Sequence, residues 1–329
     1  MSDRSDPSAL NARFLAANQL FDAQQYEAAL PLYEGLLGQY QSTAQQDYLE
    51  RQIAKTLLLL ERYEEAIPHI ESTIDSRRRA SDSVEIDLSN LGLAYLHTGQ
   101  LGAAATVLQE AITGWEALRA GAAELDQITL FEQQAYTYSL LQRVRVAQGD
   151  WQAALTLSEQ SRAQTFVEQL ARRAGQTTPP IDLAQMRQIA QQQRATLVTY
   201  SVLGNGRRIL GNELDTETDL LIWVIPPEGE ITFEAVPLSP LWEQFTNRLE
   251  NLTPLESLVY SSRTALGIDD RGFADTTWSS FKVRRPSQVP DVDTIPLRSL
   301  YQVLIEPIQA SLPADPNKQV VFVPQGSLF

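Results

Sequence analysis

Apolar positions recur with a fixed pattern through the first half of the chain, and one short motif appears four times. Each copy places a large apolar residue three positions before a small one: Tyr26 and Ala29, Tyr63 and Ala66, Leu101 and Ala104, and Trp151 and Ala154. Successive copies are 37, 38 and 50 residues apart (63 − 26, 101 − 63 and 151 − 101). Steps near this size are typical of arrays of paired helices, and the longer last step predicts an extended segment between two repeats.

The third copy carries the fullest pattern. Leu91, Gly92 and Tyr95 fit a first helix, Gly99 fits a turn, and Ala104, Leu108 and Ala111 fit a second helix. This pattern resembles the tetratricopeptide repeat, whose helix pairs stack because one repeat cannot bury its apolar face alone. Small residues are expected where helices approach closely: Ala17, Ala54 and Gly92 in first helices, and Ala29, Ala66, Ala104 and Ala154 in second helices. The fourth first helix has Gln142 at that position.

The resemblance implies a concave face lined by the first helix of each pair. Projecting the repeat pattern along the chain places six residues on this face: Asn18, Arg51, Lys55, Ser89, Leu93 and Arg143. A groove with such a basic floor suits an acidic peptide or a carboxylate terminus. The alternative interpretation is a solvated surface without a ligand, or one covered by the second half of the chain.

The second half mixes helices with strands. We expect a helix over 151–175, a linker over 177–180, and a helix over 183–194 with Asp182 as its N-cap. Strand-like runs follow at 196–203, 219–225 and 231–236, and the turn 226–229 joins the last two as a hairpin. Amphipathic helices are expected over 241–252 and 297–308, with a long polar loop over 269–293 between them. The predicted domains are 1–176 and 177–329.

The run 320–323, Val-Val-Phe-Val, has no polar face and is closed by Pro324 and Gly326. Such a run predicts a strand buried on both sides inside a parallel sheet. A strand of this kind needs neighbouring strands and covering helices, and little sequence comes after it before Phe329. We therefore expect the second half to be an incomplete α/β domain.

Three stretches of the second half resemble the CHAT domain, a caspase-like domain found attached to tetratricopeptide repeats. They are 158–164 (SEQSRAQ), the runs 197–201 and 222–225 followed by Gly229 and Phe233, and 301–308 followed by 321–328. The resemblance covers the whole chain. It implies a fold of class α + α/β, with a tetratricopeptide-type α-helical repeat array followed by an incomplete caspase-like α/β domain.

The resemblance carries over no catalytic residue. The caspase-like CHAT domains use a histidine and a cysteine located after the matched passage, and the cysteine attacks a peptide carbonyl. This chain has no cysteine, and its two histidines, His69 and His97, lie in the repeats. The leading hypothesis is a non-catalytic scaffold that binds a partner protein or peptide. The alternative is a fragment of a caspase-like cysteine endopeptidase whose dyad lies beyond Phe329, and a third hypothesis is self-association through the sheet edge at 320–323.

Composition and charge narrow the classes of partner. The net charge of −15 argues against binding to nucleic acid or anionic lipid, and the longest apolar runs are too short for a membrane span. The lack of cysteine suits a reducing cytoplasm and removes disulfides and thiolate metal sites. No cofactor is expected, because no spacing of histidines and carboxylates predicts zinc and Gly204–Gly206 reads as a turn. The acid pairs at 269–270 and 291/293 are expected to be solvated charge, and the basic run 77–79 is expected to complement the dipole at a helix C-terminus. Ser327 follows Gly326 but has no histidine near it in the sequence, which argues against a serine hydrolase.

Overall fold

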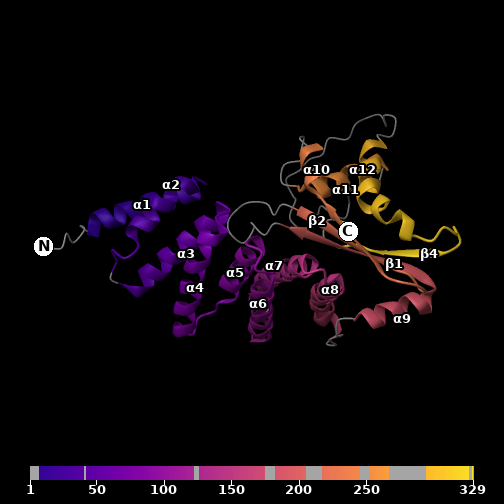
Figure 1. Ribbon diagram of the computed structural model, residues 1–329, viewed down its shortest axis with the longest axis horizontal. Coiled ribbons are helices and arrows are strands. Elements are labelled where there is room, and N and C mark those ends of the chain that lie inside the picture. Colours follow the sequence, from indigo (N-terminus) through magenta and orange to yellow (C-terminus); the bar gives the residue numbers. More distant parts are fainter. Residues whose placement is uncertain are drawn as a thin grey trace. The chain divides into compact units, whose positions relative to one another are not determined.

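The computed structural model describes residues 7–40, 42–121, 126–174, 182–204, 217–244, 252–266, 294–325 and 328. The described residues divide into two compact units, one within 7–174 and the other within 182–328. The first unit is helical, and the second combines a four-stranded sheet with helices (Figure 1). The predicted linker 177–180, the polar loop 269–293, Gly206 and Ser327 lie outside the described residues.

Eight helices follow one another along the described part of the first unit. They are α1 (Pro7–Asp22), α2 (Tyr26–Leu36), α3 (Thr43–Leu59), α4 (Tyr63–Ala80), α5 (Glu85–His97), α6 (Leu101–Gly121), α7 (Asp126–Ala147) and α8 (Trp151–Ala174). Each helix packs on the next, and α5 also packs on α7. This is the helix-pair arrangement that the four sequence copies predict, with α1–α2, α3–α4, α5–α6 and α7–α8 as the pairs.

Small residues allow the close approach within each pair, as predicted. Ala17, Ala29, Ala66, Ala104 and Ala154 are fully buried. Gly92 of α5 is the tightest position, because a Cβ atom there would lie 2.4 Å from Cγ of Leu108 in α6. Leu108 is itself fully buried and cannot swing into solvent. The third repeat therefore requires glycine at position 92.

The long step before the fourth repeat has a different origin from the one predicted. The helices α6, α7 and α8 contain 21, 22 and 24 residues, whereas α5 contains 13. The extra length thus lies largely within α6 and α7, and the prediction of an extended inter-repeat segment was wrong. Only 122–125, outside the described residues, separates the two helices.

The second unit is built around a mixed sheet with the strand order β3-β2-β1-β4. Its strands are β1 (Ala195–Gly204), β2 (Glu217–Ile225), β3 (Thr232–Pro237) and β4 (Gln319–Val323), and its helices are α9 (Leu183–Gln193), α10 (Ser239–Gln244), α11 (Pro254–Ala265), α12 (Thr294–Leu304) and the 3₁₀ helix η2 (Glu306–Ser311). β1 pairs antiparallel with β2, which pairs antiparallel with β3, and β1 pairs parallel with β4. The predicted hairpin is confirmed.

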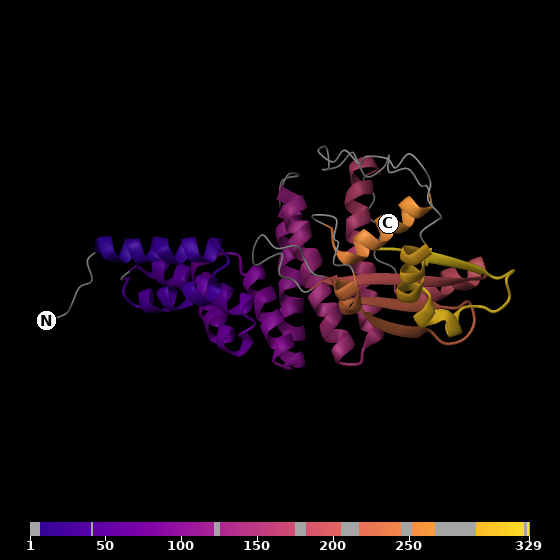
Figure 2. The same ribbon diagram turned by 90° about the horizontal axis from the view of Figure 1, so that it is seen from above.

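One face of this sheet carries the core of the unit. Val198, Ile222 and Val224 pack with Leu255 and Leu258 of α11, and the cluster also includes Tyr200, Leu220, Val303 and Ile308. Figures 1 and 2 agree that α10, α11 and α12 cover this face, whereas α9 lies on the other. The phenol of Tyr200 donates a 3.0 Å hydrogen bond to the carbonyl of Leu304 and so links the sheet with α12.

Strand β4 forms where it was predicted, but it is not buried on both sides. It lies at an edge of the sheet as described, all five of its residues are at least partly exposed, and Phe322 is 47% exposed. The physical reason is that β4 has one described neighbour, β1. The apolar run therefore indicates a preference for strand structure, and not burial of the strand on both sides.

Helix boundaries also differ from the prediction between 239 and 311. Of the expected helix 241–252, the described part is α10, which starts at Ser239, while Leu252 is not helical. The expected helix 297–308 is α12 followed by η2. Helix α11 was missed altogether. None of the described helices combines the length and the apolarity that a membrane span needs.

Candidate interaction surface

Helices α1 and α3 lie side by side and point the same way, because two contacts join them at one constant offset. The rings of Phe14 and Tyr48 are 5.4 Å apart between centroids, and Nζ of Lys55 lies 5.1 Å from the centroid of the Phe21 ring. Both pairs are 34 residues apart (48 − 14 and 55 − 21). We call the exposed and half-buried residues along this seam the α1–α3 surface: Phe14, Leu15, Asn18, Phe21 and Asp22 of α1, and Tyr48, Arg51 and Lys55 of α3.

Asn18 is held in place from beneath by the second helix of its own repeat. The hydroxyl of the buried Tyr33 donates a 2.8 Å hydrogen bond to Oδ1 of Asn18. Because Oδ1 is occupied, the Nδ2 amide is the part of the side chain that can donate to a ligand. Half-buried in α1, Asn18 is thus an oriented hydrogen-bond donor.

Two cations lie on the α3 side of this surface. Lys55 is half-buried, so desolvation lowers its pKa, although the nearby Asp22 carboxylate acts in the opposite direction. Its position over the Phe21 ring is a cation–π contact, which holds the ammonium group in place. Arg51 is exposed one helical turn earlier. Neither cation forms an ion pair within 4 Å among the described residues.

Two of the six predicted groove residues are buried instead. Ser89 is 1% exposed, and its hydroxyl lies 2.8 Å from that of Thr137 in α7 and donates to the carbonyl of Glu85. Leu93 is 3% exposed and belongs to the core of the repeats. The prediction that both face a groove was wrong, because α7 packs on α5 and covers this face of it.

The sixth predicted residue, Arg143 of α7, is half-buried, and its charge acts on His97. Partial burial first, and then Arg143, lower the pKa of His97, whose ring stacks on Tyr63 at 4.1 Å. Asn18, Arg51 and Lys55 therefore belong to the α1–α3 surface, whereas the charge of Arg143 acts on His97, the last residue of α5.

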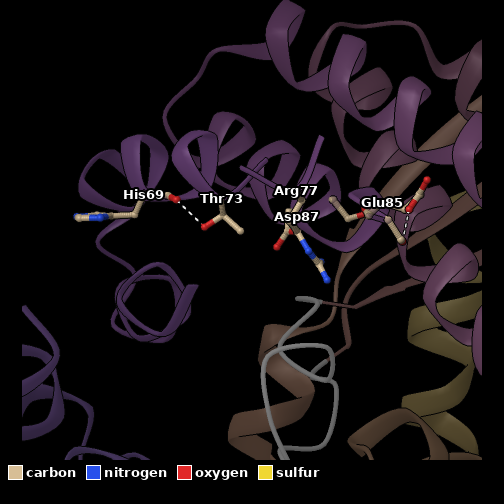
Figure 3. A network of polar contacts seen from close by, with 7 residues as sticks. His69, Thr73, Arg77, Glu85 and Asp87 are labelled. Atoms are coloured by element: carbon tan, nitrogen blue, oxygen red, sulfur yellow. Dashed lines mark hydrogen bonds and ion pairs between the residues drawn. The ribbon is translucent and has the colours of Figure 1, made fainter. Parts of the chain in front are cut away.

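The two histidines have structural partners. Nδ1 of His69 in α4 lies 2.5 Å from a carboxylate oxygen of Glu50 in α3. Thr73 and Arg77 lie on the same face of α4 as His69, one and two helical turns further on (Figure 3). The guanidinium group of Arg77 donates a 2.9 Å hydrogen bond to the carboxylate of Asp87 in α5. These contacts tie α4 to both neighbouring helices. Within the described parts of the chain, no three His, Cys, Asp or Glu side chains gather as a metal ion would require.

Sequence reasoning missed the apolar part of the α1–α3 surface. Leu15 is 52% exposed and Tyr48 is 36% exposed. Phe14, whose ring contacts Tyr48, packs against the core of the repeats. The helical spacing could have identified this part. Phe14 stands one helical turn before Asn18, and Tyr48 stands two turns before Lys55, each pair on one helix face. Their apolar character favoured assignment to the core.

Comparison with known proteins supports the repeat assignment. A family profile described as "Tetratricopeptide repeat" matches residues 88–118, which lie in α5 and α6. No curated protein matches the chain. Among solved structures, one described as "Podosopora anserina putative kinesin light chain nearly identical TPR-like repeats" is similar to this chain at 17% sequence identity. The match covers 52% of this chain and 99% of that chain. The TM-score is 0.29, too low to support an argument about fold or function. On the family match and the helix pairs, the chain is a protein with tetratricopeptide-type repeats.

Proposed function

We propose that the repeat unit is a scaffold that binds a partner protein through the α1–α3 surface. Tetratricopeptide repeats suggest a role in protein interaction, and this surface offers an acidic peptide or a carboxylate terminus three polar groups: the Asn18 amide, Arg51 and Lys55. The observation that carries the proposal is that Arg51 and Lys55 have no ion-pair partner among the described residues although the chain has a net charge of −15. Arg143 remains a candidate for a more distant part of the same groove.

Charge reversal tests this function. The double variant Arg51→Glu/Lys55→Glu should lose a partner that the wild-type chain recovers in a pull-down, because the carboxylates would repel an acidic ligand. Lys318→Glu is the matched control, since Lys318 is exposed and lies in the other unit. Equal recovery by all three proteins would rule out the α1–α3 surface, and Arg143→Glu then shows whether the groove lies further along the repeats.

For the second unit we propose a caspase-like domain of the CHAT type, with the domain boundary near 176/177. Its support is the mixed sheet, in which β1 lies between antiparallel β2 and parallel β4. The scaffold hypothesis and the alternative, a fragment of a cysteine endopeptidase, make different predictions about the gene beyond the codon for Phe329. A reading frame that continues with a histidine and a cysteine favours the endopeptidase, and a stop codon favours the scaffold.

We also propose self-association through the edge of β4. The strand contains no charged residue and no proline, two of the devices that commonly protect sheet edges, and Phe322 is exposed on it. Light scattering over rising concentrations should show a dimer, which Val321→Lys should weaken. A wild-type chain that stays monomeric at high concentration would contradict this proposal.

A further inference from the structure

The α1–α3 surface has an apolar end that the proposed acidic ligand alone would leave uncovered. Leu15 and Tyr48 are its most exposed apolar side chains, at 52% and 36%. The Tyr48 ring is fixed from two sides, since it contacts Phe14 and its hydroxyl accepts a 2.6 Å hydrogen bond from Nε2 of Gln52. Leu15 directly follows Phe14, the residue that Tyr48 contacts, so both exposed apolar side chains belong to the same end of the surface. A restrained ring at this end favours contact with an apolar group, because little side-chain entropy remains to be lost.

The opposite end of the same surface is cationic. Lys55 is restrained over Phe21, and Arg51 lies between Lys55 and Tyr48 on α3. Asp22 is the competing charge at this end, because its carboxylate is close enough to raise the pKa of Lys55. The charge of Arg51 acts on the buried Asp87 of α5, whose pKa it lowers.

The distance between the two ends follows from helix geometry. The apolar contact is at Phe14 and the cationic contact at Phe21, seven residues further along α1. At 1.5 Å per residue, the two ends are about 10 Å apart along the helix axis. The identical offset on α3, from Tyr48 to Lys55, gives the same spacing.

We propose that the α1–α3 surface recognises an extended segment of a partner protein in which a large apolar side chain and an Asp or Glu side chain lie about 10 Å apart. The apolar side chain contacts Leu15 and Tyr48, and the carboxylate contacts Lys55, with the Asn18 amide as a donor between them. The inference rests on the proposed function and deepens it, because it names the chemistry of the ligand.

The spacing selects a sequence pattern. In a polyproline II segment, residues i and i+3 lie on one side and are about 9 Å apart. In a β-strand, positions on the same side are about 7 or 13 Å apart, so the match is poorer. The ligand should therefore carry its acidic residue three positions from its apolar residue.

The experiment is selection of random dodecapeptides, displayed with their C-terminus attached to the carrier, against the full chain. The selected peptides should be enriched in Asp or Glu three positions from a large apolar residue. Their affinity, measured on synthetic peptides with an amidated C-terminus, should fall about tenfold in Lys55→Gln and in Leu15→Ser. Asp22→Asn should increase the affinity about two- to fivefold, because a repelling carboxylate is removed.

Leu118→Ser and Lys318→Gln are the matched controls, because Leu118 is an exposed leucine elsewhere in the repeat unit and Lys318 lies in the other unit. Both should bind the selected peptides as the wild type does. Peptides that bind Leu15→Ser and Lys55→Gln unchanged, or that show no preferred spacing, would overturn this inference while leaving protein binding by the repeats intact. Binding that needs a free C-terminal carboxylate would overturn it as well, since the proposed ligand contacts Lys55 through an Asp or Glu side chain.

Discussion

Helices α5 and α6 of the repeat unit meet through Gly92 and Leu108, which are 16 residues apart (108 − 92), whereas strands β1 and β4 pair Ala195 with Gln319, 124 residues apart (319 − 195). In the repeats, each helix packs mainly on its sequence neighbours. In the sheet unit, the core joins residues from strands, helices and η2 that are far apart in the sequence. One unit is therefore held together by local contacts and the other by distant ones.

This difference determines how far a local defect spreads. A repeat array has a stability close to the sum of its repeats and their interfaces, so a defect weakens mainly its own neighbourhood. A unit with a single core shared by distant segments unfolds in one cooperative transition, so a defect lowers the stability of the whole unit. Substitutions in the two units should therefore differ in how many helices or strands they destabilise, and also in how much stability they cost.

The largest effect is expected in the sheet core. Ile222→Ala removes a fully buried side chain from the cluster on the α10–α12 face and should cost about 2–5 kcal/mol of unfolding free energy. Hydrogen exchange should show a loss of protection in β1, β2 and β3 together. The partly buried Val236 of edge strand β3 is the control, since Val236→Ala removes less buried surface. Exchange confined to β2 would contradict a shared core.

The next effect concerns the Arg77–Asp87 pair between α4 and α5. Burial raises the pKa of Asp87, and Arg77 partly opposes this shift. Arg77→Ala should therefore raise that pKa further and cost about 1.5–3 kcal/mol at neutral pH, because a buried carboxylate loses its charged partner. Arg79→Ala removes an exposed side chain whose hydrogen bond, to the carbonyl of Asp75, stays within α4, and should change stability by less than about 0.5 kcal/mol.

The pH dependence of this variant has a definite sign. A carboxyl group whose folded-state pKa is raised loses stability as pH climbs from its unfolded value, about 3.9, through the folded one. The cost of Arg77→Ala should thus be smaller at about pH 4 than at about pH 7, as measured by urea denaturation at both values. An equal cost at both pH values would show that the Arg77 side chain acts through packing rather than charge.

The smallest effect is expected at the α5–α6 seam. Gly92→Ala would bring a methyl group against Leu108, and the overpacking cost of about 1–3 kcal/mol exceeds the gain in helix propensity of up to about 1 kcal/mol. Gly102→Ala has open space around it and should be stabilising by a few tenths of a kcal/mol. Faster exchange should be concentrated in α5, α6 and their neighbours. A uniform loss across α1–α8 would contradict local coupling.

The sequence predicted best those features that depend on nearby residues. Asp182 caps α9 with a reciprocal Gln185 contact, and the turn 226–229 joins β2 to β3, because both signals act within four residues. Helix α11 was missed although Thr253 and Glu256 form a similar capping box at its start. That signal is local too, and it was overlooked because the expected helix 241–252 ended beside it.

The errors arose where distant packing decides the outcome. Ser89 and Leu93 occupy repeat positions equivalent to those of Arg51 and Lys55, yet α7 covers them. The burial of β4 could not be read from its composition, because that depends on which strands lie beside it. Of the six predicted groove residues, the three on α1 and α3 form one surface, and register alone could not distinguish them from the rest.

The parallel pairing of β1 with β4 has a consequence for biosynthesis. Helix α5 can pack as soon as α6 emerges, but β1 can pair with β4 only after synthesis has advanced by 115 residues, from Gly204 to Gln319 (319 − 204). At translation rates of about 5–20 residues per second, the delay is about 6–23 s. During this interval the apolar edge of β1 is open to other nascent chains. We expect the ribosome-bound sheet segment, rather than the repeats, to be the part of this protein that depends on a chaperone.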